Sequence, residues 1–247
     1  MDLMIGTLIE KLDNFERYVR NSFGSDMSSR TGRFWVYVHF HLMDHAFLRV
    51  FWNNFHHVSD QVFRANQPSP SHLNAYKKKG IEAVLNLRGI NKQSFYLLEE
   101  KACKDLDLEL ISIPLSSSSA PQPEKILEVI SILEKIPKPF VLHCKSGADR
   151  AGLVSAIYLI VQQKLSVTEA KKQLSFKYLH LDFTKTGILD YLFDVFSERL
   201  KIGHIDFVDW LKQEYDADIL NSAFKSRVEW TRTANDLMEF SNAKYKC

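Results

Sequence analysis

Short apolar segments alternate with stretches of helical periodicity from residue 59 onward, and this alternation constrains the fold more than any other feature. The segments expected to be strands are residues 61–65, 83–87, 108–113 and 140–143. The segments expected to be helices are residues 72–79, 95–106, 121–135, 151–163 and 168–174. Such alternation is typical of a parallel sheet covered by helices. We therefore predict an α/β fold with a central, mostly parallel sheet of four to five strands flanked by helices.

Composition limits which binding partners and which cellular compartment are expected. The 247 residues include 32 Lys and Arg against 30 Asp and Glu, so the net charge of +2 gives no support for a nucleic-acid partner. Three cysteines occur without any close pair, which favours a reducing compartment. The first residues lack a basic stretch followed by a long apolar run, so secretion is not indicated. We expect a cytoplasmic protein.

The turn after the last expected strand carries the residues for phosphate chemistry. Cys144 follows an apolar run, Arg150 comes six positions later, and Gly147 lies between them. A helix that begins near residues 148–150 would aim backbone N–H groups and the positive end of its dipole at the turn. These groups favour a bound dianion, and they favour at Cys144 a thiolate that can attack phosphorus. Arg150 would bind two phosphate oxygens at once.

The chain resembles the cysteine-dependent phosphatases with the motif His-Cys-x5-Arg in four residues: His143, Cys144, Gly147 and Arg150. Within that family it is most similar to the compact dual-specificity-like branch. Residues 62–69 and 80–88 look like the opening strands of bacterial and fungal members of this branch. The resemblance covers roughly residues 58–200 and implies a dual-specificity-phosphatase-like fold for them.

The resemblance also implies a function and a set of residues. It implies a bacterial-type phosphatase of the protein-tyrosine-phosphatase class that forms a phosphocysteine intermediate and needs no metal or cofactor. The implied catalytic residues are Cys144, Arg150 and Asp149. The implied phosphate-binding residues are Lys145, Ser146, Gly147, Ala148, Asp149 and Arg150. The substrate would be a phosphotyrosine or another phosphorylated protein side chain, or a lipid phosphate.

Two positions depart from the family pattern. The residue after the arginine is Ala151, where the family usually has Ser or Thr to help the thiolate leave, so breakdown of the intermediate is expected to be slow. Residues 114–121, where the usual acidic loop would lie, contain no carboxylate. Asp149 is our candidate general acid, because similar loops of myotubularin-type lipid phosphatases place an aspartate there. Its alternative is a helix-start residue; Glu124 is a weaker rival that suits the first turn of a helix.

The variable positions leave the substrate open. Lys145 adds a cation to the turn and so favours a highly anionic or lipid headgroup, unless its side chain extends into solvent. The alternatives to a protein phosphatase are a phosphoinositide or phospholipid phosphatase and a catalytically weak, phosphate-binding pseudophosphatase. Sulfur transfer by a rhodanese-like domain is disfavoured, because its loop is generally one residue shorter. Cys103 and Cys247 are expected to be inert.

The ends of the chain are predicted to be helical additions. We divide the chain into an N-terminal helical extension over residues 1–57, a catalytic domain over residues 58–200, and a C-terminal helical extension over residues 201–247 that packs on the catalytic domain. Residues 1–23 have the period of an amphipathic helix.

The aromatic segment at residues 34–58 is expected to be a helix packed over the catalytic domain. Its alternative is peripheral contact with a membrane surface. Charged residues and histidines interrupt the segment, so it is not expected to cross a bilayer. His41 and His45 are spaced like metal ligands, but no third ligand is suggested and we expect no metal.

Overall fold

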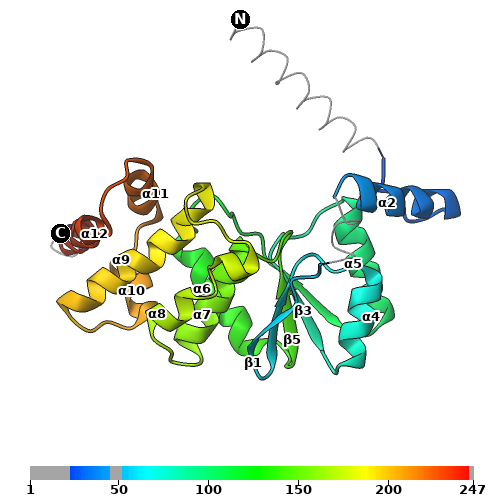
Figure 1. The fold of residues 1–247 in the computed structure, drawn as a ribbon, viewed down its shortest axis with the longest axis horizontal. Helices are drawn as coiled ribbons and strands as arrows, with labels where there is room; N and C mark the ends of the chain where they lie inside the picture. The colour runs from blue at the N-terminus through cyan, green and yellow to red at the C-terminus, as the bar shows by residue number, and fades with distance from the viewer. Residues whose placement is uncertain (1–22, 45–51, 245–247) are drawn as a thin grey trace, which may run out of the picture.

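The computed structural model describes residues 23–44 and 52–244. One five-stranded sheet lies at its centre (Figure 1). Its strands are β1 (His56–Ser59), β2 (Val62–Ala65), β3 (Ala83–Asn86), β4 (Glu109–Ser112) and β5 (Phe140–His143). The strand order is β1-β2-β5-β3-β4, with β1 antiparallel to β2 and all other neighbours parallel. The predicted mostly parallel α/β fold is therefore confirmed.

The register brings the carboxyl ends of the parallel strands to one level. His143 at the end of β5 pairs with Ala65 at the end of β2 and with Asn86 at the end of β3. Asn86 in turn pairs with Ser112 at the end of β4. The turns that follow these strands therefore meet at one edge, where ligands of open α/β sheets bind.

Helices cover both faces of the sheet. The helices before the last strand are α2 (Arg30–Leu42), α4 (Pro70–Lys78), α5 (Ser94–Asp105) and α6 (Pro123–Lys135). Those after it are α7 (Asp149–Val161), α8 (Val167–Lys171), α9 (Ile188–Ile202), α10 (Phe207–Gln213), α11 (Ala217–Lys225) and α12 (Trp230–Lys244), with single 3-10 turns η1 (Phe176–Tyr178) and η2 (Lys185–Gly187). Figure 1 shows α4 and α5 on one side of the sheet and α6 and α7 on the other.

The strands divide their side chains between two apolar cores. Phe140 and Leu142 of β5 join the core formed with α6, α7 and α9, whereas Val141 joins the core formed with α4 and α5. The first core continues into the C-terminal helices through packed aromatic rings, among them Phe196 and Trp210 with centroids 4.9 Å apart. The division of the chain into three regions stays a prediction.

The aromatic segment at residues 34–58 differs from its prediction as one helix. Helix α2 ends at Leu42, residues 45–51 lie outside the described part, and β1 begins at His56. Asn54 has a φ of 46°, a left-handed conformation that asparagine tolerates and that no helix contains. The prediction of a helix at residues 1–23 falls almost entirely outside the described residues.

Two expectations about metals and membranes also concern this end of the chain. His45 lies outside the described residues, and the described residues contain no group of three His, Cys, Asp or Glu side chains arranged to hold a metal ion. Within residues 23–44 and 52–244, no helix combines the length and the apolar content that crossing a membrane requires.

Candidate active site

The loop at residues 144–148, here called the cradle loop, connects the buried strand β5 to helix α7. Gly147 at its centre has a φ of 74°, which disfavours any other residue. A Cβ atom on Gly147 would lie 2.7 Å from the backbone of Ala65 and Asn66. Glycine is therefore required both by the turn and by the close approach of strand β2. The sequence motif thus forms a strand, loop and helix as predicted.

The carbonyl groups of the cradle loop are bound from outside. Gln67 N–H donates to the carbonyl of Lys145 at 3.2 Å, and the Asn54 amide donates to that of Ser146 at 3.0 Å. The guanidinium of Arg64 donates to two more, at 2.7 and 2.9 Å: those of Gly147 and Ala148.

This outer binding orients the N–H groups. In a planar trans peptide the carbonyl of one residue and the N–H of the next point in opposite directions. Four outward carbonyls therefore turn the N–H groups of residues 146–149 toward the inside of the loop. Within the described part of the chain, the N–H groups of Ser146 and Gly147 donate no hydrogen bond, whereas that of Ala148 reaches the Ser146 hydroxyl at 3.3 Å. Such a concave row of N–H groups binds anions.

Arg64 supports the loop from beneath. Its side chain is fully buried, donates to the Gln173 backbone at 2.6 Å, and stacks on Tyr178 with 3.8 Å between the guanidinium carbon and the ring centre. Burial lowers the pKa of Arg64 to about 10, against the opposing charges of Tyr178, Cys144 and Asp149, so it stays charged at neutral pH. Sequence analysis assigns no role to Arg64, because only the sheet topology brings this residue under the loop.

Arg150 is a cation beside the cradle loop that has no ion pair among the described residues. It lies in the first turn of α7, and its Nε is buried without a hydrogen-bond partner within the described residues. No ion pair of Arg150 occurs among those residues either. Cys144 at the start of the loop is 1% exposed. A buried donor without a partner marks a place for a ligand.

His143, on the sheet side of the loop, belongs to a buried network. Its Nε2 lies 2.6 Å from Glu99 Oε1, an ion-pair distance at which the N–H is not aligned for a hydrogen bond, and both side chains are fully buried. Gln67 joins the other oxygen of Glu99 at 3.1 Å and accepts from Arg88 at 2.8 Å. Arg88 forms a bidentate pair with Asp44, at 2.9 and 3.2 Å. This network connects the cradle loop to the end of α2.

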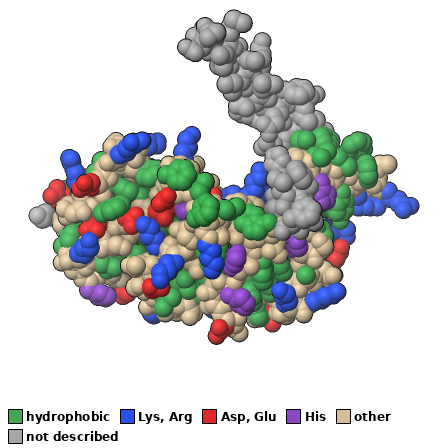
Figure 2. All heavy atoms as spheres, in the orientation of Figure 1, with side chains coloured by type: hydrophobic (Ala, Val, Ile, Leu, Met, Phe, Trp, Pro, Cys, Tyr) green, Lys and Arg blue, Asp and Glu red, His purple; other side chains and the backbone are tan. Residues whose placement is uncertain are grey.

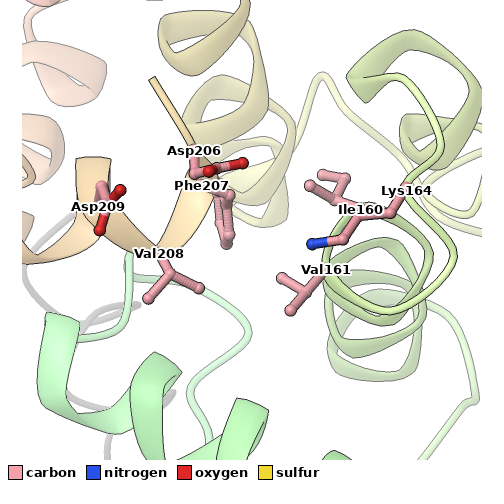
Figure 3. A pocket seen from close by; sticks show the side chains of 7 residues that line it. All are labelled: Ile160, Val161, Lys164, Asp206, Phe207, Val208 and Asp209. Atoms are coloured by element: carbon pink, nitrogen blue, oxygen red, sulfur yellow. The ribbon is translucent and has the colours of Figure 1, made fainter. Parts of the chain in front are cut away.

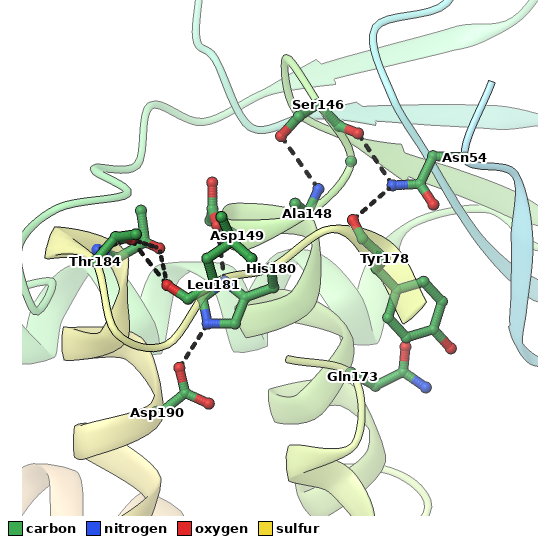
Figure 4. A network of polar contacts seen from close by, with 12 residues as sticks. Asn54, Ser146, Ala148, Asp149, Gln173, Tyr178, His180, Leu181, Thr184 and Asp190 are labelled. Atoms are coloured by element: carbon green, nitrogen blue, oxygen red, sulfur yellow. Dashed lines mark hydrogen bonds and ion pairs between the residues drawn. The ribbon is translucent and has the colours of Figure 1, made fainter. Parts of the chain in front are cut away.

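Asp149, on the other side of the loop, contacts a histidine that the sequence analysis missed. Figure 4 shows His180 between Asp149 and Asp190. His180 Nδ1 lies 2.7 Å from Asp149 Oδ1, and Nε2 lies 2.5 Å from Asp190 Oδ2. Burial alone would lower the pKa of His180, but the hydrogen bonds and charges of the two carboxylates outweigh it and raise the pKa to about 9. His180 is thus a cation at neutral pH.

The remaining predicted residues lie in different places. Lys145 is exposed at the rim of the cradle loop, and Ser146 is half-buried. Glu124 is exposed in the first turn of α6 and lines a separate hollow with residues of α10 and α12. Cys103 is buried in α5, where burial raises the pKa of its thiol. The structure brings Asp149 to the loop and gives Glu124 the place of a helix-start residue.

A cavity of about 190 Å³ lies elsewhere, between the end of α7 and the start of α10 (Figure 3). It is lined by Ile160, Val161, Lys164, Asp206, Phe207, Val208 and Asp209. No residue of the cradle loop lines it, so it is not part of the candidate active site.

Several solved structures are similar to the chain. TpbA of P. aeruginosa is 17% identical with a TM-score of 0.46, covering 70% of this chain and 91% of its own. Tk-PTP is 21% identical with a TM-score of 0.47, covering 57% of this chain and 97% of its own. The core catalytic domain of the PP-IP phosphatase SIW14 of S. cerevisiae is 16% identical with a TM-score of 0.45, covering 72% of this chain and 93% of its own.

No curated protein matches the chain. Residues 53–186, more than half of the chain, match the family described as "PTP-NADK: DSP-PTPase phosphatase fused to NAD+ Kinase". That match spans the sheet, the cradle loop and the segment that holds His180. The chain therefore belongs to this family of dual-specificity-like cysteine phosphatases.

Proposed function

We propose that the protein hydrolyses phosphomonoesters with Cys144 as the nucleophile. The observation that carries this proposal is the cradle loop, whose carbonyl groups at residues 145–148 are bound from outside while Arg150 has no ion pair among the described residues. A tetrahedral phosphate seated there would receive the inward N–H groups and a bidentate guanidinium. Membership in a phosphatase family supports the reaction class.

The reaction has two displacements. In the first, the Cys144 sulfur bonds to phosphorus while the bond from phosphorus to the leaving oxygen breaks, and Asp149 protonates that oxygen. In the second, a water oxygen gives a proton to Asp149 and bonds to phosphorus, the bond to sulfur breaks, and inorganic phosphate leaves. Positioning and charge stabilisation dominate phosphoryl transfer, and the N–H groups and Arg150 supply both.

The second displacement depends on stabilising the departing thiolate. Ala151 is fully buried and offers no hydroxyl to that thiolate. The stabilisation must come from the N-terminal end of α7 and from the loop N–H groups. We propose that the enzyme works without metal or cofactor, in a reducing cytoplasm that protects Cys144 from oxidation, and that breakdown of the phosphocysteine is its slow step.

The test is phosphate release from p-nitrophenyl phosphate and from phosphotyrosine peptides. We expect turnover by the unchanged chain and its loss in Cys144→Ser, because a hydroxyl is a much weaker nucleophile than a thiolate. Cys103→Ala is the matched control, since Cys103 is buried in α5 outside the cradle loop. Turnover that survives in Cys144→Ser, or no turnover in the unchanged chain while Cys144→Ser binds phosphorylated ligands, contradicts the proposal.

A second candidate substrate, a phospholipid monoester, is favoured by the rim of the site. Residues 176–185, here called the rim segment, contact the start of α7, directly after the cradle loop, through His180 and Asp149. Three large apolar side chains of this segment are exposed by 73%, 50% and 81%: Phe176, Leu179 and Phe183. Two exposed lysines accompany them, Lys177 and Lys185. Figure 2 shows hydrophobic and basic side chains exposed together on the upper side of the molecule.

Apolar side chains beside lysines suit an anionic membrane surface. We expect the protein to sediment with vesicles that contain phosphatidylserine and to lose this binding in Phe183→Ser. The matched control is Phe240→Ser, because Phe240 is 48% exposed on α12. Equal sedimentation of both variants, or none by the unchanged chain, would leave phosphorylated proteins as the proposed substrates.

A further inference from the structure

We infer that His180 is the proton store of this active site: its imidazolium supplies the proton that Asp149 gives to the leaving group, and Asp190 holds the ring in place. This inference rests on the proposed phosphatase function and adds two residues, His180 and Asp190, to it. His180 acts through Asp149, so it is a positioning and proton-transfer residue that does not touch the reacting atoms.

The geometry calls for a proton in each of the two contacts of the ring, and an imidazolium between two carboxylates supplies both. Both ring nitrogens of His180 face a carboxylate oxygen, at 2.7 and 2.5 Å. A neutral imidazole has one N–H, so one of these contacts would place a lone pair against a carboxylate. An imidazolium donates to both oxygens. The ring is 1% exposed, so solvent does not take the place of either partner.

The backbone before His180 is held in an uncommon conformation. Leu179 has a φ of 62°, in the left-handed region that residues other than glycine rarely adopt. The Thr184 hydroxyl donates to the carbonyl of Leu181 at 2.8 Å on the other side. These features direct the His180 ring inward while the Leu179 side chain stays half-exposed. Uncommon backbone conformations of this kind concentrate at functional sites.

Asp149 is arranged to pass a proton on. One of its oxygens meets His180, the other accepts no hydrogen bond within the described residues, and its side chain is 22% exposed. Asp149 lies next to Arg150 in the first turn of α7, at the cradle loop. The charged groups around the pair are Asp190 on α9, Arg64 beneath the loop and Arg150. Asp149 therefore lies between the buried imidazolium of His180 and the solvent-accessible side of the cradle loop, where a leaving group would be.

Substrate binding would move the proton. A phosphate dianion beside the Asp149 carboxylate repels its negative charge and so favours transfer of the Nδ1 proton of His180 to Asp149. As the leaving oxygen departs from phosphorus it takes this proton, and His180 stays neutral with its remaining proton directed at Asp190. In the second displacement, the attacking water loses a proton to Asp149, and that proton returns to His180. The cycle conserves protons and needs no other reactant.

The test compares good and poor leaving groups. His180→Asn keeps a side-chain N–H for Asp149 but has no proton to transfer. We expect kcat/KM for an alkyl phosphate to fall about 100-fold and kcat/KM for p-nitrophenyl phosphate to change less than about 3-fold. In Asp190→Asn the alkaline limb of the pH profile for the alkyl phosphate should move to lower pH. Equal losses on both substrates, or an unmoved alkaline limb, would show that His180 has only a structural role and would overturn the inference.

A second measurement does not depend on turnover. In Cys144→Ser labelled with 13C at histidine, the ring signals of His180 should titrate above about pH 8 and shift to lower pH in Asp190→Asn. Titration of His180 at the ordinary value of a histidine overturns the inference, whatever the activity. A protein that shows the high titration but releases no phosphate from any substrate contradicts the proposed function instead.

Discussion

Two histidines flank the cradle loop, and each lies within 2.7 Å of a carboxylate, yet their surroundings differ. His143 ends strand β5 and meets Glu99, both of them fully buried. His180 meets Asp149, whose side chain is 22% exposed. One pair is enclosed in the scaffold, and the other reaches the open side of the loop.

This difference in surroundings indicates different roles: His143 helps to hold the cradle loop in shape, and His180 takes part in proton transfer. Glu99 is joined by hydrogen bonds through Gln67 and Arg88 to Asp44. A substitution at His143 therefore disturbs a network of buried polar side chains. Asp149, the partner of His180, lies directly after the cradle loop. We therefore expect changes around His143 to act mainly on stability, and changes around His180 to act mainly on proton transfer and on pH dependence.

The largest effect is expected from breaking the enclosed pair. Glu99→Ala leaves His143 and the Gln67 amide without their buried partner, and removing one member of a buried pair costs about 3–5 kcal/mol of unfolding free energy. Urea denaturation at neutral pH measures this loss. Asp105→Ala is the matched control on the same helix, because its pair with Lys101 is exposed and contributes less than about 1 kcal/mol. A loss for Glu99→Ala as small as that of the control would contradict the assigned scaffold role.

The pH dependence of stability should come from the other histidine. Folding raises the pKa of His180 from 6.5 to about 9, against the effect of burial, through Asp149 and Asp190. A group whose pKa is raised in the folded state stabilises it fully below the unfolded value and loses that contribution as the pH rises through the folded value. The free energy of unfolding should therefore fall between pH 6.5 and about 9, by about 2–3 kcal/mol.

Urea denaturation at about pH 6 and about pH 10 measures this fall. Asp190→Asn should reduce the fall, because it removes one of the two carboxylates that hold the charge. Glu99→Gln should leave it in place, since Glu99 does not contact His180. A fall that is the same in Asp190→Asn as in the unchanged chain would show that the titrating group lies elsewhere.

Sequence analysis could predict the features of the site that depend on residues close together in the chain. The apolar run, Gly147 and the following helix lie within a few residues of Cys144, so the cradle loop could be predicted with its His143. His180 lies 31 residues beyond Asp149, and Asp190 lies 10 residues beyond His180; no spacing rule connects the three. Arg64 and Glu99 also reach the loop only through the order of the strands and the packing of α5.

The missed edge strand has a different cause. Residues of β1 have the burial of a half-exposed edge strand, and the sequence His-His-Val-Ser shows no alternation of apolar and polar residues. The aromatic residues before it suggested a continued helix. Asn54 ends that pattern with a left-handed conformation, which a single sequence indicates only weakly.

The smallest effect is expected at Asn54, and it sharpens the comparison because this residue connects the cradle loop with the rim segment. The Asn54 amide donates to the carbonyl of Ser146 at 3.0 Å and to that of Tyr178 at 3.1 Å (Figure 4). Asn54→Gly keeps the left-handed backbone and removes these two bonds along with a small buried side chain, so we expect a loss of about 1 kcal/mol in the free energy of unfolding.

Activity on an alkyl phosphate and on p-nitrophenyl phosphate then shows whether the Asn54 bonds affect phosphate binding or proton transfer. Because Asn54 ties the loop to the segment that holds His180, the Asn54→Gly variant should lose more kcat/KM on an alkyl phosphate than on p-nitrophenyl phosphate. Asn53→Gly is the neighbouring control, since the side chain of Asn53 bonds only to the Phe55 N–H among the described residues. Equal losses on both substrates in Asn54→Gly would mean that the bond shapes the N–H groups of the cradle loop and does not align the proton path.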